Sequence, residues 1–241
     1  MFSSDDIDGF SYEVLFEKEA LEKKPLEDLF GKLTLGSLKM KRFSGISLVS
    51  EKLGEIIPTV EFTDREREKE YYTGLRVHEN KIELFIRKPE EELVIGHEEP
   101  AKEQPRKPFS GDSLRELSQD LDFVVGVFIG FMRGDRPLKS RVEMTVSRKS
   151  EPVTLDHLYK DDYLSKIGGF ATNPRLTGLQ LNCEETLLGI RTLSEWEIYH
   201  SKGKMKVRVI SKMEGVAAVN LAEVIRDRID RINSLVEISS G

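Results

Sequence analysis

The stretch EWEIYHSKGKMKVRVI, from Glu195 to Ile210, decides the fold. Polar and apolar residues alternate along both of its arms, as they do in strands that cover a core with one face and meet water with the other. A turn at Lys202-Gly203 joins the arms into an antiparallel hairpin and places Glu197 opposite Arg208. The pattern therefore favours an antiparallel sheet.

The segment from Tyr72 to Arg87 predicts a second hairpin of the same kind. A turn at Glu79-Asn80 pairs apolar residues on one face and charges on the other: Val77 with Ile82, Leu75 with Leu84, and Arg76 with Glu83. Both hairpins carry a His and a Lys at the corner, as His78-x-x-Lys81 in the first and near His200, ahead of Lys204, in the second. This corner suggests a duplication, although two short matches do not establish a repeat.

Hydrophobic periodicity places further elements around these hairpins. Strands are predicted at residues 12–16, 46–49, 56–62, 141–147, 176–182 and 186–191. Helices are predicted around residues 21–33 with a break at Pro25, after the capping box Ser113-x-x-Glu116, over residues 154–164, and after Asn220-x-x-Glu223. The last of these carries an apolar stripe from Leu221 to Val236.

The run from Phe123 to Met132 is the most apolar segment of the chain. Its ten residues are too few for a membrane span, which needs about 20 as helix. β-Branched and aromatic residues favour a buried central strand, and continuation of the preceding helix is the alternative.

These elements predict an α+β fold with mainly antiparallel sheet, hairpins, flanking helices and a long C-terminal amphipathic helix. Prolines alternate with acidic runs before residue 112, as expected of an exposed connection. We therefore expect an acidic α+β half at residues 1–97, a Pro/Glu-rich linker at 98–112, and an α+β half at 113–241 with the central apolar strand and the C-terminal helix.

The composition is that of a globular chain with one large domain or two small ones. The chain has 241 residues, of which 38% are hydrophobic and 33% charged, with a mean hydropathy of -0.39 and a net charge of -6. Residues 1–110 carry 18 basic and 24 acidic side chains, and residues 111–241 carry 19 of each. Neither half is basic, which disfavours non-specific binding of nucleic acid.

The single cysteine, Cys183, excludes an internal disulfide and a zinc site built from cysteines. The first residues lack the basic and apolar regions of a signal peptide, so we expect a cytoplasmic protein. Charged residues are abundant beside only three Gln and five Asn, which is typical of thermophile proteins.

No motif of catalysis or cofactor binding is present in the sequence. The four histidines lie far apart, and the only local cluster, Asp156-His157 with Asp161-Asp162, is more simply a solvated helix face. Cys183 lies beside Glu184-Glu185, which would raise its thiol pKa and make it a poor nucleophile. We predict no catalytic residue, no metal and no cofactor.

Two segments are candidate sites, each with a more ordinary explanation. The loop at residues 168–178 combines flexible glycines with groups that hold anions: Gly168, Gly169, Thr172, Asn173 and Arg175. A glycine-capped helix end followed by a turn accounts for the same residues. The second hairpin carries a basic strip, Lys202, Lys204, Lys206 and Arg208, which its own partner strand offsets through Glu197.

Three functions follow from these patterns. The first is a non-catalytic binding or assembly protein that engages a protein partner or a second copy of itself through the antiparallel sheet. The alternative is a small-molecule binding protein or enzyme with Arg175 as anion anchor. The third is nucleic-acid binding through the basic strip together with Arg133, Arg136, Lys139 and Arg141. No membrane partner is expected.

Overall fold

The computed structural model describes eleven stretches of the chain. They are residues 1–16, 23–37, 39–50, 58–64, 71–78, 80–88, 109–131, 137–149, 178–201, 203–214 and 220–240.

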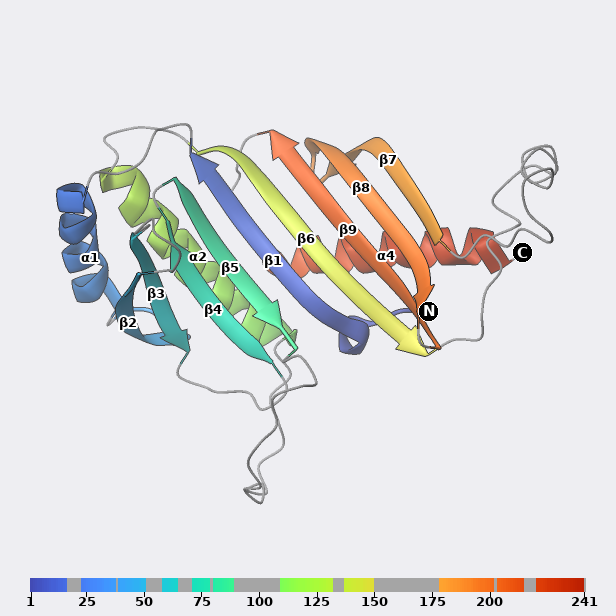
Figure 1. The fold of residues 1–241 in the computed structure, drawn as a ribbon, viewed down its shortest axis with the longest axis horizontal. Coiled ribbons are helices and arrows are strands. Elements are labelled where there is room, and N and C mark those ends of the chain that lie inside the picture. The colour runs from blue at the N-terminus through green and yellow to red at the C-terminus, as the bar shows by residue number, and fades with distance from the viewer. Residues whose placement is uncertain are drawn as a thin grey trace, which may run out of the picture.

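One sheet with nine described strands forms the body of the protein (Figure 1). The strands are β1 (Ile7–Phe16), β2 (Phe43–Ser50), β3 (Pro58–Asp64), β4 (Tyr72–Val77), β5 (Lys81–Arg87), β6 (Pro137–Lys149), β7 (Gly178–Leu187), β8 (Ile190–Ser201) and β9 (Lys204–Glu214). Their order is β2-β3-β4-β5-β1-β6-β9-β8-β7, and every pairing is antiparallel. The predicted α+β class with mainly antiparallel sheet is confirmed.

Helices cover one face of this sheet. The described helices are α1 (Lys23–Ser37), α2 (Gly111–Phe131), α4 (Leu221–Ser240) and the short 3₁₀ turn η1 (Ser4–Asp6). In Figure 1 α2 and α4 lie behind the sheet, and α1 packs against α2 and β2 at one end. The core lies between these layers, where side chains such as Tyr12, Leu84, Val142, Val207 and Phe128 are fully buried. Within the described residues, no helix is long and apolar enough to cross a membrane.

The strand order repeats about the centre of the sheet. β1 is followed by a meander that returns to its side as β5, and β6 is followed by one that returns to its side as β9. A helix comes next in each case, α2 after β5 and α4 after β9, and β1 pairs with β6 in the middle. The described chain is thus two topologically similar halves, β1 to α2 and β6 to α4. Residues 98–108 of the predicted linker lie outside the described residues, and Gly111 and Asp112 at its end begin α2.

The predicted strand from Phe123 to Met132 is wrong, because residues up to Phe131 continue the helix α2. The buried residues Leu117, Leu121, Val124 and Phe128 recur every three or four positions, which is the helical period. Tertiary packing of this stripe outweighs the strand preference of the β-branched residues between them. The helix also begins earlier than the predicted capping box, because the Ser113 amide donates to Ser110 Oγ at 3.3 Å.

The predicted break between strands at residues 183–185 is also wrong. β7 and β8 run through to a tight turn at Leu188-Gly189, where φ is +50° and +80°. Such a turn needs left-handed backbone at both positions, and leucine there gives no sequence signal for it. Cys183 consequently lies within β7, where it is exposed, and not at a strand end.

Both predicted hairpin registers are confirmed. Val77 pairs with Ile82 and Leu75 with Leu84. In the other hairpin, Glu197 pairs with Arg208 and Tyr199 with Lys206. One detail differs, because Arg76 forms its ion pair with Glu61 on β3, at 3.4 Å, although Glu83 lies opposite it in the ladder.

A buried charge on α2 fixes the first half. Asp120, which is 1% exposed, accepts the backbone amides of Lys41, Arg42 and Phe43 at 2.6, 2.7 and 3.2 Å. These three donors lie at the start of β2, so the carboxylate ties this edge of the sheet to the helix layer.

A buried charge of opposite sign on α4 fixes the second half. Arg228 is fully buried and donates to Glu185 on β7. Arg231 Nη1 contacts the second oxygen of Glu185 at 2.6 Å, and Asp227 holds Arg231 at 2.9 Å as the i, i+4 spacing predicts. This network ties β7, the last strand on this side, to the helix layer.

Candidate functional site: the open face of the sheet

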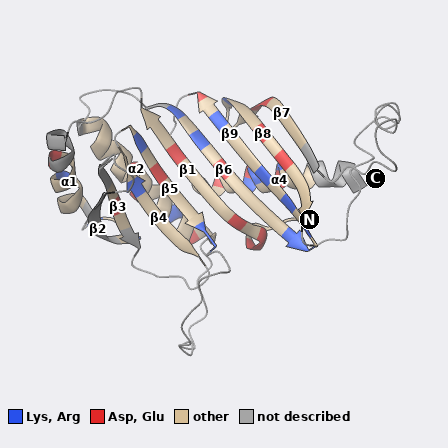
Figure 2. Cartoon of the chain, viewed as in Figure 1, with Lys and Arg blue, Asp and Glu red and all other residues tan. Residues whose placement is uncertain are grey.

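The face of the sheet opposite the helices is the candidate functional surface, and we call it the open face. Side chains alternate along each strand, so Val142, Met144 and Val146 of β6 enter the core while Arg141 and Glu143 point to the open face. Figure 2 shows that charged segments of both signs recur across the strands of this face.

Two carboxylates meet near the centre of the open face. Glu13 and Glu83 are opposite each other on β1 and β5, and each residue is only 9% exposed. Lys81 Nζ lies 3.0 Å from Glu13 Oε1 and 3.6 Å from Glu83 Oε2, so one ammonium serves both. Arg141 Nη1 approaches the other oxygen of Glu13 at 3.5 Å. The pair is therefore held by cations on both sides.

The charges around Glu83 keep it ionised. His78, with Nε2 3.6 Å from Glu83 Oε2, is the largest cause that lowers the pKa of Glu83 to about 2. Burial opposes this effect, and Lys81 and Arg87 add to it. A carboxylic acid that donates a proton in catalysis needs a raised pKa. Glu83 is thus an ion-pair partner and no general acid at neutral pH.

A second group of ion pairs continues across β6, β9 and β8. Glu143 Oε2 lies 2.9 Å from Arg141, and its Oε1 lies 2.8 Å from Arg208 Nη2. Arg208 Nη1 also contacts Glu197 at 3.3 Å, and these hydrogen bonds raise the pKa of the Arg208 guanidinium. Arg141 and Arg208 are therefore neutralised by the open face itself.

Three lysines at one end of β6 and β9 have no such partner among the described residues. Lys149 pairs with Lys204 across the ladder, and Ser147 pairs with Lys206. No ion pair joins any of the three ammonium groups to a described carboxylate. Figure 2 shows the blue segments of β6 and β9 meeting at this end. We call Lys149, Lys204 and Lys206 the cationic corner.

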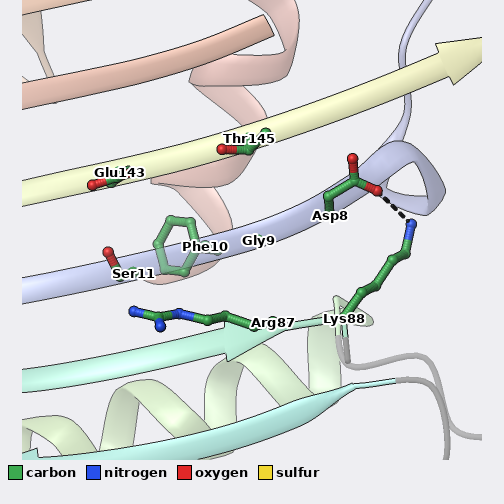
Figure 3. Close-up of a pocket in the computed structure, with 8 residues that line it drawn as sticks. All are labelled: Asp8, Gly9, Phe10, Ser11, Arg87, Lys88, Glu143 and Thr145. Carbon is green, nitrogen blue, oxygen red and sulfur yellow. Dashed lines mark hydrogen bonds and ion pairs between the residues drawn. The ribbon is translucent and has the colours of Figure 1, made fainter. Parts of the chain in front are cut away.

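A shallow hollow of ≈ 400 Å³ lies beside this corner on the central strands (Figure 3). It exists because Gly9 and Ser11 of β1 carry little or no side chain. Thr145 borders it on β6 and Arg87 on β5, and an ion pair of 3.0 Å between Lys88 and Asp8 closes one end. Most of the residues that line it are polar or charged, and its open form suits a segment of a larger ligand better than an enclosed small molecule.

Most of the sequence-predicted site residues cannot be placed. The five candidate residues of the predicted loop at 168–178 lie outside the described residues, namely Gly168, Gly169, Thr172, Asn173 and Arg175, and so do Lys202, Arg133, Arg136, His157 and Asp161-Asp162. The described basic residues lie on the open face in two groups: Lys204 and Lys206 at one end of the β6–β9 pair, Lys139 and Arg141 at the other. Arg208 and Glu143 lie between them, so the two groups form no continuous basic strip.

Lys149 is the residue that sequence reasoning missed. Lys149 lies just after the strand predicted at residues 141–147. No local sequence pattern tells which strand pairs with β9 on the side opposite β8, so the closeness of Lys149 to Lys204 could not be predicted. In the described part of the chain, no group of three His, Cys, Asp or Glu side chains is arranged to hold a metal ion. No protein-family model, curated protein or solved structure matches the chain.

Proposed function

We propose that this chain is a non-catalytic binding protein whose open sheet face meets a macromolecular partner. The single observation that carries the proposal is the one-sided cover of the sheet, with α2 and α4 on one face and none of the described helices on the other (Figure 1). A wide sheet face that none of the described helices covers presents many side chains on one rigid surface, and such an arrangement suits recognition of a large partner.

The chemistry of the open face favours reversible binding over a permanent dimer. Obligate interfaces have apolar centres, whereas the centre here is the ion-paired group around Glu13 and Glu83. The large apolar side chains exposed on the described part of this face are few and lie on outer strands, namely Tyr72, Leu193 and Tyr199. The ionised state of Glu83 likewise supports recognition over acid catalysis.

Site-specific photo-crosslinking tests the proposal. A benzophenone amino acid replaces Thr145 at the centre of the open face or, as matched control, the exposed Arg226 on α4. Each protein is irradiated in extract of the source organism, and crosslinked species are resolved by mass. We expect a discrete macromolecular adduct from position 145 and none from position 226. An adduct formed only from position 226 would show that the helix side is the binding surface.

A further inference from the structure

The hairpins of the two halves occupy matching positions but carry different charges. In the first hairpin the His78 amide donates to the Lys81 carbonyl at 2.7 Å, and in the second Ser201 pairs with Lys204, so two residues form each turn and positions can be counted from it. Lys81 is the first residue of β5, and Lys204 is the first residue of β9. Two residues further on, Glu83 in the first half corresponds to Lys206 in the second. The acid that neutralises Lys81 is thus replaced by another cation.

The central strands show the same replacement. Glu83 pairs with Glu13 of β1, whereas Lys206 pairs with Ser147 of β6. Lys81 pairs with Leu15, whereas Lys204 pairs with Lys149. The four matched positions therefore hold one cation and two acids in the first half, and three cations and no acid in the second.

The cationic corner carries an electrostatic cost in the unbound protein. Like charges directly opposite each other on a sheet are destabilising, and Lys149 faces Lys204 with no described carboxylate paired to either. An anion lying between the ammonium groups would remove this repulsion. The corner is therefore built for a bound anion, in contrast to its neutral counterpart in the first half.

We propose that the cationic corner binds the phosphate backbone of single-stranded nucleic acid, and this rests on the proposed function of the open face. Tyr199 lies directly opposite Lys206 on β8 and is 36% exposed, so an aromatic ring adjoins the cations. Cations that track phosphates beside a ring that stacks on bases are the usual components of single-strand sites. An acidic peptide would use the lysines but not the ring, and a duplex offers no unpaired base to it.

The surroundings of the corner fit an extended strand. The Ser147 hydroxyl lies among the three lysines in the ladder, and Thr145, two residues before it on the same face, leads into the hollow beside Gly9. The net charge of -6 does not oppose this binding, because ionic screening limits long-range repulsion to about 8 Å at physiological salt. Glu143 on β6 and Glu197 on β8 are already paired with Arg208, and Asp8, which borders the hollow, is paired with Lys88.

Fluorescence anisotropy with a labelled twelve-residue oligothymidylate and the full chain tests this proposal. Three phosphate contacts predict a slope of about -2 for log affinity against log salt, or about a twenty-fold loss from 50 to 200 mM salt. The variant K204E/K206E should lose at least tenfold in affinity. The control K139E/K212E changes the charge by the same amount at the other end of the β6–β9 pair and should stay within about twofold. Tyr199→Ala should weaken binding at least about fivefold.

Three results would overturn the proposal: no binding of the oligonucleotide, equal loss in both double variants, or tighter binding of polyglutamate or of duplex DNA of the same length. Unfolding curves of each variant exclude a folding defect as the cause of lost binding. If the oligonucleotide does not bind but position 145 still forms a crosslinked adduct, only the nucleic-acid partner is refuted. Crosslinking only from position 226 would instead refute the open face as a binding surface.

Discussion

The two halves of the sheet share one plan and use their charges differently. In the first half, Lys81 is shared by Glu13 and Glu83, and Gly74 leaves room for the Phe85 ring, over which Arg76 lies at 4.7 Å. In the second half, the positions that match the two acids hold Ser147 and Lys206. One framework thus satisfies its own charges in the first half and leaves three lysines without an ion-pair partner among the described residues in the second.

The two helices that cover the sheet hold it with buried charges of opposite sign. α2 holds the first half by the carboxylate of Asp120, which accepts three amides. α4 holds the second half by the guanidinium of Arg228, and Arg231 shares the same carboxylate, Glu185. No other described side chain accepts the three amides that Asp120 binds. If Arg228 is lost, by contrast, Arg231 can still hold Glu185.

Asp120→Ala should have the largest effect on stability. The change leaves three amides near the start of β2 without their acceptor, so the free energy of unfolding should fall by about 3 kcal/mol. Urea unfolding at pH 7 measures it, with the exposed Asp230→Ala on α4 as control, expected within about 0.5 kcal/mol of the parent. Equal effects of the two changes would refute Asp120 as the anchor.

Glu83→Gln should change how the free energy of unfolding depends on pH, whereas the matched change in the second half should not. The folded-state pKa of Glu83, about 2, lies below its ordinary value of 4.5, so its ionised form stabilises the fold fully above pH 4.5. This contribution is lost as the pH falls from 4.5 to 2. With allowance for residual solvent, the variant should be less stable than the parent by about 2 kcal/mol at pH 7.

The same difference should shrink at pH 3 and vanish near pH 2. Unfolding by urea at these pH values measures it. The matched change in the second half, Lys206→Gln, should show no loss that depends on pH over this range. A Glu83→Gln deficit that stays constant from pH 7 to pH 3 would contradict the low pKa.

Lys204→Glu should have the smallest effect and the opposite sign. The new carboxylate faces Lys149, so a repulsion becomes an attraction and the free energy of unfolding should rise by about 0.5 kcal/mol at low salt. The gain should fade as salt is added, because exposed pairs are screened. A loss of stability in thermal unfolding at low salt would show that the corner carries no repulsion.

Local patterns in the sequence predict the hairpins well and the site poorly. Alternation and turn length fix the register of Tyr199 with Lys206, because both act between neighbouring residues. The β-branched residues after Phe123 favour a strand, whereas the helix that the segment forms depends on packing against distant parts of the chain. The pairing of Lys149 with Lys204 joins segments 55 positions apart in the chain, and spacing alone does not determine such contacts.

We propose that the partner binds at the cationic corner of the open face. Amide chemical shifts of the full chain, followed by NMR during addition of the oligothymidylate, test it most directly. We predict the largest shifts at Ser147, Lys149, Lys204 and Lys206, and small shifts at Lys212 and along α4. Shifts concentrated on α4 or spread evenly over the sheet would contradict the account.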